Sequence, residues 1–271
     1  MEAQQPAERA DGKTRVGRGW QMTRVAWRLT WRDRTVLLLA VLGVVFGLLG
    51  AIAIFFAVAG HAPLLHRSSR TQLAPLVLVA AYPMVFLGVF FHVAIAAAAG
   101  ARLEGRPMRL RDVVGRTLQQ GDHVALWSIL AMIVGLAFRS LGASTPGAAS
   151  LLIWIIELGW VLMTIFVIPL LAMEDIGPLS AVNRSGSLLS KAWGEGLTGL
   201  VGIGLWQFAL SVPALFLVVA GLGAAIVGAG GVVLPVVAAG VLALLAVAAL
   251  ATAMRQVFAV ELYRYAAGDA A

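Results

Sequence analysis

Six long runs of apolar residues, separated by short polar or basic connections, limit what this chain can fold into. A helix needs about 20 apolar residues to cross ~30 Å of hydrocarbon, and each run has that length. Only helices and closed barrels satisfy their backbone inside a bilayer. We therefore expect an all-α fold, a polytopic transmembrane helix bundle of six spans. The expected spans lie near 36–59, 73–99, 124–142, 150–173, 197–222 and 232–256.

The composition excludes a water-soluble protein. Hydrophobic residues make up 61% of the 271 residues and charged residues only 12%, which is about half the charge of an ordinary soluble domain. So few charges cannot cover a surface that faces water, and so apolar a chain is not disordered. The chain contains no cysteine, which excludes disulfides, thiolate nucleophiles and cysteine-ligated metals.

The distribution of basic residues predicts an orientation. The net charge is +7, and the basic residues gather before the first run, after the second, after the fourth and at the end of the chain. Six spans place these segments on one side, and the positive-inside rule makes that side cytoplasmic. We expect a multi-pass plasma-membrane protein with cytoplasmic N- and C-termini. Its partners are then membrane lipids, since basic segments beside apolar spans meet anionic phospholipid, and not nucleic acid.

The chain divides into a basic, Trp-rich N-terminal segment at 1–35, a six-span membrane domain at 36–266 and a tail at 267–271. In the first segment, three tryptophans share one helical stripe and three arginines run beside it. Tryptophan rings prefer the headgroup region and arginines pair with lipid phosphate. We expect an interfacial helix before the first span, with a docking site for a partner as the alternative. The candidate lipid-headgroup contacts are Trp20, Arg24, Trp27, Arg28, Trp31 and Arg32.

Two connections on the cytoplasmic side have the pattern of amphipathic helices. From Leu179 to residue 193, apolar residues recur at helical spacing, and polar residues such as Arg184 fall on the opposite arc. Pro178 suits the first position of that helix. The stretch 108–120 has a similar pattern. We expect both to be helices at the cytoplasmic face.

Glycines and prolines occur within the spans. Small residues allow transmembrane helices to approach closely, so we interpret Gly199, Gly202, Gly204 and the Gly43-x-x-x-Gly47 pair as packing positions. Whether the Gly/Ala-rich stretch 221–231 is a turn, a re-entrant piece or part of a span is left open. Prolines, which kink helices, interrupt four spans at Pro83, Pro169, Pro213 and Pro235.

No known catalytic, cofactor-binding or metal-binding motif is present, so no catalytic residue, cofactor or metal is predicted. Ionisable residues within spans are costly to bury without a partner. Three of them, His92, Arg139 and Glu157, form the candidate intramembrane polar site. The connection between the third and fourth spans is short, so Arg139 is expected to reach Glu157. A structural ion pair, an arginine that reaches the surface, and an ion- or proton-linked site are the alternatives.

Several short motifs carry a resemblance to a known family. With them, the chain resembles a family of uncharacterised six-span prokaryotic integral membrane proteins. It is also distantly similar, after the fourth span, to the membrane domain attached to some glycerophosphoryl diester phosphodiesterases. The resemblance implies the fold and a prokaryotic membrane, but no activity. The motifs are Trp27-Arg28-Leu29, Arg32-Asp33, Gly105-Arg106-Pro107, the stretch from Phe166 to Pro178, Ser180-Ala181, Arg184-Ser185, Trp193-Gly194-Glu195 and Tyr263-Arg264-Tyr265.

We therefore expect an integral membrane protein that is not an enzyme, a scaffold or accessory protein acting through its cytoplasmic face, where a protein partner would bind. The alternative is a small permease or channel that uses the Arg139/Glu157 pair. A membrane-embedded enzyme would need His92 and Glu157 to converge on one cavity. The sequence leaves the oligomeric state open.

Overall fold

The structure is a computed structural model that describes residues 5–60, 70–144, 147–174, 176–226, 228 and 230–268. Every regular element in these ranges is a helix, and six helical segments are long and apolar enough to cross a membrane. The expected all-α bundle of six spans is confirmed, and the protein is a multi-pass membrane protein. The helices are α1 (Gln5–Arg32), α2 (Arg34–Gly60), α4 (Arg70–Leu103), α5 (Leu110–Gln119), α6 (Gly121–Ser144), α7 (Ala148–Met163), α8 (Val167–Glu174), α9 (Pro178–Ile226) and α10 (Gly230–Ala267).

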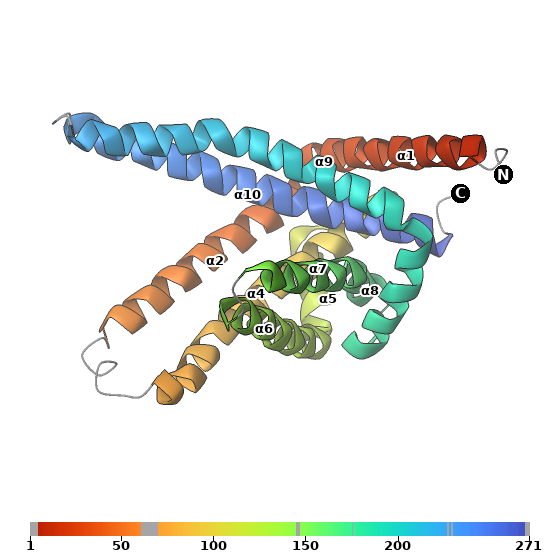
Figure 1. The fold of residues 1–271 in the computed structure, drawn as a ribbon, viewed down its shortest axis with the longest axis horizontal. Coiled ribbons are helices and arrows are strands. Elements are labelled where there is room, and N and C mark those ends of the chain that lie inside the picture. Colours follow the sequence, from red (N-terminus) through yellow and green to blue (C-terminus); the bar gives the residue numbers. More distant parts are fainter. Residues whose placement is uncertain are drawn as a thin grey trace.

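The spans are arranged as three helical hairpins, α2 with α4, α6 with α7, and α9 with α10. In Figure 1 the hairpins meet toward the right and diverge toward the left, where the turn between α9 and α10 lies. Helix α1 runs beside α9 and α10 and roughly parallel to them, and the last turns of α10 lie near its first turns. We call the end that holds α1, α5, α8 and the last turns of α10 the basic end.

The buried core lies at the basic end rather than along the whole bundle. In α4 the buried stretch runs from Val89 to Ala99, and in α10 most buried residues lie from residue 249 onward. Far from this end, apolar side chains are open, such as Phe56 at 68% and Ile226 at 87% exposed. Apolar side chains that face lipid need no protein partner, whereas chain that projects beyond the hydrocarbon must bury its apolar faces against itself. The three hairpins therefore pack against one another at the basic end and leave their other ends open, and the packed part includes residues within the span of α4.

Glycines set the close approach of α9 to α10. A Cβ atom at Gly199 would lie 2.0 Å from the ring of Phe258, so the predicted packing role of this glycine is confirmed. Gly202 faces Thr23 of α1, with more room. For Gly204 and Gly47 the prediction was wrong, because a Cβ there would meet open space. Gly204 lies on an exposed face of α9, and Gly47 is half-buried on α2.

The fourth expected span is not one continuous helix. Helix α7 ends at Met163, a turn follows at 164–166, and α8 begins at Val167. The sequence predicted the interruption at Pro169, but the break precedes it. Pro169 lies in the first turn of α8, where a missing backbone N–H costs no helical hydrogen bond. Ser185 of α9 stabilises the break, since its hydroxyl donates to the Met163 carbonyl at 2.5 Å and accepts from the Phe166 N–H at 3.2 Å.

The amphipathic helix expected after the fourth span forms the first part of α9. It begins at Pro178, as predicted, and ends at a kink where Ala192 departs from helical geometry (φ −129°, ψ 19°). The buried stripe includes Ala181, Ser185 and Leu188, whereas Leu179 of the predicted apolar arc is 68% exposed. Packing thus uses the stripe next to the predicted arc. At the other end, α9 ends at Ile226 and α10 begins at Gly230, with Gly228 between them at φ +78°, so the described residues of 221–231 form two helix ends and a turn position.

Candidate functional site

Asp33 joins the N-terminal segment to the spans. It separates α1 from α2, and its Oδ1 accepts hydrogen bonds from the backbone N–H groups of Thr35 at 2.9 Å and Val36 at 3.3 Å. This is the capping arrangement that helix N-termini favour. Its Oδ2 lies 3.7 Å from Nε of Arg102 on α4. One carboxylate therefore starts the first span and ties it to the neighbouring span.

A buried ion pair fixes α1 against α9. The Arg18 guanidinium lies 2.8 Å from Oε1 of Glu195, whose side chain is only 2% exposed. Arg18 also lies over the ring of Tyr265, 5.9 Å from its centroid. Gly19 allows the helices to touch, because a Cβ there would lie 3.0 Å from the Glu195 carbonyl oxygen. These contacts hold α1 in a fixed position along α9 and α10.

A groove of about 600 Å³ lies where α1 meets α9 and α10. All six residues predicted as lipid-headgroup contacts line it, together with Trp206 of α9 and Met254 of α10. The Trp27 and Trp206 rings stack with centroids 5.7 Å apart. We call this surface the Trp/Arg groove. It is lined by Trp20, Thr23, Arg24, Trp27, Arg28, Trp31, Arg32, Trp206 and Met254.

The Trp/Arg groove carries uncompensated positive charge. Arg24, Arg28 and Arg32 are exposed and, within the described ranges, make no ion pair. Arginines at four-residue steps occupy one helix face, so their charges add along the groove. Guanidinium groups bind phosphate through paired N–H donors. The groove therefore combines aromatic walls with three phosphate-binding groups.

The position of the groove along α9 and α10 matches the expected level of lipid headgroups. Arg255 of α10 is hydrogen-bonded to Gln207 of α9, next to Trp206. Between this contact and the turn at Gly228, neither helix contains an ionisable residue. That length is close to the ~20 residues that cross a bilayer. The groove lies where the apolar length ends, and tryptophan is enriched at such a boundary.

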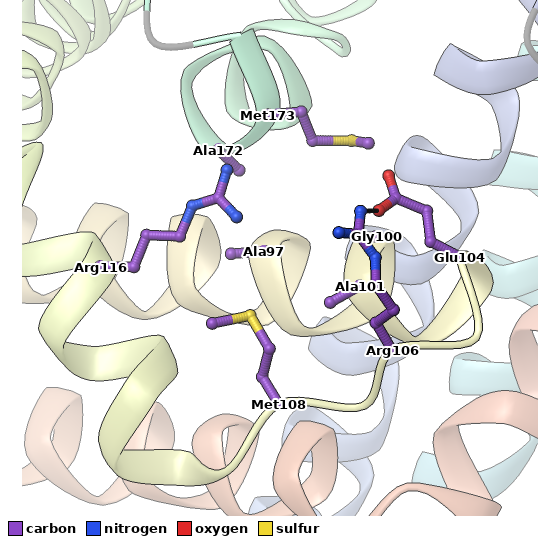
Figure 2. Close-up of a pocket in the computed structure, with 9 residues that line it drawn as sticks. All are labelled: Ala97, Gly100, Ala101, Glu104, Arg106, Met108, Arg116, Ala172 and Met173. Carbon is purple, nitrogen blue, oxygen red and sulfur yellow. Dashed lines mark hydrogen bonds and ion pairs between the residues drawn. The ribbon is translucent and has the colours of Figure 1, made fainter.

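A second cavity, of about 290 Å³, lies among α4, the loop after it, α5 and α8. Figure 2 shows the side chains of Arg106 and Arg116 directed into it from opposite walls, with Glu104 joined to Arg106. Small and flexible apolar residues form the rest of the lining. We call it the α4–α5 cavity. Its lining residues are Ala97, Gly100, Ala101, Glu104, Arg106, Met108, Arg116, Ala172 and Met173.

The sequence Glu104-Gly105-Arg106-Pro107 builds one wall of the α4–α5 cavity. Gly105 adopts φ +74°, the Arg106 N–H donates to the Ala101 carbonyl at 2.8 Å, and the Gly105 N–H donates to the Arg102 carbonyl at 3.1 Å. This pattern is a Schellman motif, which glycine favours and which proline commonly follows. The reversal of the chain places Glu104 and Arg106 on either side of the glycine, where they form an ion pair.

Charge in the α4–α5 cavity is only partly neutralised. Glu104 pairs with Arg106, which is 80% exposed, whereas Arg116 makes no ion pair with any described residue. Neither arginine was predicted as a site residue, and Arg106 appeared only within the Gly105-Arg106-Pro107 motif, so their shared cavity was missed. The Gly105-Arg106-Pro107 motif was the available signal, because it indicates a sharp turn that positions its arginine.

Glu174, at the end of α8, accepts a hydrogen bond from the Tyr263 hydroxyl of α10 and lies 3.0 Å from Nη2 of Arg184 on α9. It therefore joins three helices at the basic end. Its neighbour Met173 lines the α4–α5 cavity. Met173, which borders the cavity, is therefore adjacent in sequence to Glu174, the residue that links α8 to both α9 and α10.

The three residues of the candidate intramembrane polar site are not brought together. His92 of α4 lines a small cavity of about 100 Å³ with residues of α2 and with Thr252 of α10. Arg139 and Glu157 lie exposed on α6 and α7. No hydrogen bond or ion pair joins any two of these three in the described part of the chain. Within the same ranges, no group of three or more His, Asp or Glu side chains is placed to hold a metal ion.

Comparison with known proteins gives one family and no individual relative. A profile described as a family of unknown function (DUF6159) matches residues 73–271. No curated protein and no solved structure matches the chain. The matched region contains every residue that lines the α4–α5 cavity, whereas α1, with its side of the Trp/Arg groove, precedes it. The similarity to a phosphodiesterase membrane domain stays a prediction.

Proposed function

The chain belongs to the DUF6159 family, whose function is unknown, and we propose that it is a non-enzymatic scaffold or accessory protein of the membrane that holds anionic phospholipid in its Trp/Arg groove. The observation that carries this proposal is the lining of the groove. Three arginines without ion pairs and four tryptophans come together from α1 and α9.

The charge and position of the groove favour an anionic lipid over other occupants. Its open guanidinium groups match a lipid phosphate, and its tryptophans match the boundary between hydrocarbon and headgroups. Arg24, Arg28 and Arg32 have no acidic neighbour to satisfy them among the described residues. A bound phospholipid would supply the missing negative charge while its acyl chains follow the apolar surface of α9 and α10.

The rest of the molecule supports a scaffold rather than an enzyme. Its polar contacts between helices, such as the Arg18 pair with Glu195 and the Glu174 pair with Arg184, join structural elements to one another. The diverging hairpins leave wide apolar surfaces exposed. A rigid base with open apolar arms suits lateral association within a membrane. The permease alternative has less support, since Arg139 and Glu157 lie exposed on separate helices and no hydrogen bond or ion pair joins them among the described residues.

Lipid counting by native mass spectrometry tests the proposal. The full chain is reconstituted in nanodiscs of phosphatidylcholine with a minor fraction of phosphatidylglycerol, and the retained anionic lipid is counted after release. The test variant changes Arg24, Arg28 and Arg32 together to Gln. The control changes the same number of exposed basic residues at the basic end, Arg109, Arg111 and Lys191, to Gln. Both variants lose the same net charge.

A hydrogen bond between a guanidinium and a bound phosphate contributes about 1.5–3 kcal/mol, so the groove variant, which loses all three arginines, should bind anionic lipid about 100-fold or more weakly than wild type. The control should keep most of its affinity. If both variants lose the same affinity for anionic lipid, the binding depends on surface charge in general rather than on the groove, and the proposal is wrong. If a protein co-purifies in a fixed ratio and competes with the lipid, the groove binds a protein partner and the lipid proposal is wrong. Solute flux abolished by Glu157→Gln would establish the permease instead.

A further inference from the structure

We propose that the α4–α5 cavity binds a small ligand carrying a phosphate group, with Arg116 as its main anchor and Arg106 as its second. This site is separate from the Trp/Arg groove and does not depend on the function proposed above. The two arginines come from different elements, α5 and the loop after α4, and both side chains point into the same cavity (Figure 2).

The size of the cavity limits the ligand to a small molecule. Its volume of about 290 Å³ is close to the lower end of known ligand sites, about 300 Å³. A phosphate group with a body of a few carbon atoms fits this space. A folded peptide does not.

The charges in the cavity favour a dianionic group. Arg116 has no ion-pair partner among the described residues, so its binding capacity is free. The guanidinium of Arg106 already forms an ion pair with Glu104, so only part of its binding capacity is open. A phosphate monoester offers three acceptor oxygens and nearly two charges, so it is able to bridge guanidinium groups on facing walls. A single carboxylate has two oxygens and one charge, and bridges the same walls less well.

The floor of the cavity favours an apolar body on the ligand. Ala97 and Gly100 of α4 keep the space open, and Met108 and Met173 border it with flexible thioether side chains. At Gly100 a Cβ atom would lie 3.3 Å from the end of Met173, so the glycine lets the Met173 side chain lie close to α4. Methionine adapts to the shape of what it contacts. A short alkyl or aryl phosphate should therefore bind more tightly than inorganic phosphate.

A bound ligand would touch α4, α5 and α8 together. It would thus link the α4–α5 connection to α8, next to the contacts that Glu174 makes with α9 and α10. Two sources supply this chemistry, a soluble phosphate monoester and the headgroup of a lipid with a terminal phosphate. The experiment separates them.

The experiment uses the full chain in nanodiscs of phosphatidylcholine alone, so that no anionic lipid competes. Binding of phenyl phosphate and of inorganic phosphate is measured by ³¹P NMR titration. A second arm adds phosphatidic acid to the nanodisc and follows the ³¹P signal of its headgroup. The variants are Arg116→Gln, Arg116→Lys and Glu104→Gln, and the matched control is Arg111→Gln, an exposed arginine on the same helix.

Wild type and Arg111→Gln should bind phenyl phosphate equally. Arg116→Gln should bind it about tenfold or more weakly, since it loses a charged hydrogen-bond pair. Arg116→Lys keeps the charge but loses the paired N–H donors of the guanidinium, so its affinity for phenyl phosphate should lie between those of wild type and Arg116→Gln. Glu104→Gln should bind several-fold more tightly, because it frees Arg106. A general effect of surface charge would weaken binding in Arg111→Gln as much as in Arg116→Gln, so equal loss in these two variants would contradict the site.

The outcomes decide the proposal and the source of the ligand. Binding of phenyl phosphate that depends on Arg116 establishes a soluble ligand class. Binding seen only with phosphatidic acid, and lost in Arg116→Gln, establishes a lipid headgroup. If neither phosphate is bound in a manner that depends on Arg116, while all variants keep the wild-type thermal unfolding midpoint, the proposal is wrong. If Arg116→Gln does not fold, Glu104→Gln still tests it, because unchanged affinity there contradicts competition for Arg106.

Discussion

Arg18 of α1 donates two hydrogen bonds to one carboxylate oxygen of Glu195 on α9, from Nη2 at 2.8 Å and from Nε at 3.2 Å. Glu195 is 2% exposed and Arg18 is 36% exposed, so the two partners differ in their access to water. Removal of one partner of a buried pair leaves the other charge without compensation. The cost should depend on which partner is left behind.

Arg18→Ala should lower the stability of the protein more than Glu195→Gln. With Arg18 removed, a buried carboxylate loses its partner, at a cost of about 3 kcal/mol, the low end of measured values because the pair is partly exposed. With Glu195 neutralised, the remaining guanidinium still reaches water. Thermal unfolding in detergent, followed by tryptophan fluorescence, gives the order. A larger effect of Glu195→Gln would contradict the argument from burial, and wild-type stability of both variants would show that α1 does not depend on this pair.

Gly199→Ala should destabilise the α9–α10 hairpin. Its new Cβ would lie 2.0 Å from the Phe258 ring, and overpacking of this kind costs about 1–3 kcal/mol. Gly204→Ala is the matched control, since nothing lies within 4 Å of a Cβ there. The control should be neutral or slightly stabilising, by less than about 1 kcal/mol from helix propensity. Unfolding by SDS titration measures both, and similar midpoints for the two variants would contradict the packing argument.

Ser185→Ala should loosen the break between α7 and α8. The Phe166 N–H and the Met163 carbonyl both lose their hydrogen bonds to the Ser185 hydroxyl, and buried groups left unsatisfied cost about 1–3 kcal/mol. Hydrogen exchange at residues 163–167 should become faster. Ser187→Ala, which removes only an exposed bond to the Arg184 carbonyl, should leave this exchange unchanged. Equal exchange rates in the two variants would show that Ser185 does not stabilise the break.

Asp33→Asn and Asp33→Ala should separate two effects of one carboxylate. Asparagine caps a helix about as well as aspartate, so Asp33→Asn loses only the weak attraction to Arg102 at 3.7 Å. Asp33→Ala also loses the hydrogen bonds from Thr35 and Val36, which should cost about 1 kcal/mol more. Chemical denaturation of the reconstituted protein tests the difference. If both variants are equally destabilised, the ion pair rather than the cap dominates.

The fold was largely predictable because spanning helices are recognised from local composition. Each of the six apolar runs is visible in a window of about 20 residues, without knowledge of its neighbours. The beginning of α9 at Pro178 followed from the same local logic, since proline suits a first helical turn. The prediction placed the break at Pro169, a few residues too late. The carbonyls that a proline leaves without a helical hydrogen bond lie before it in the chain, and in that region Ser185 bonds the Met163 carbonyl and the Phe166 N–H.

The candidate site was predictable only in part. The Trp and Arg stripe on α1 was visible in the sequence as one helix face, and the structure adds Trp206 and Met254 from helices far along the chain. Arg116 and Arg106 carried no such pattern, since they lie on separate elements and share a cavity only after α5 folds back along α4. The Arg139 pair with Glu157 was expected from short connections alone, and short connections do not set which faces of two helices meet.

The sequence by itself determined that this chain is a multi-pass helical membrane protein, because the free energy of placing a segment in lipid is a sum over its own residues. Only the tertiary structure decided which charges are paired and which are open. Arg18 finds a buried carboxylate 177 positions away, whereas Arg24, six positions further along the same helix, finds none among the described residues. Pairing energies depend on distance and burial in space, which the order of residues does not contain.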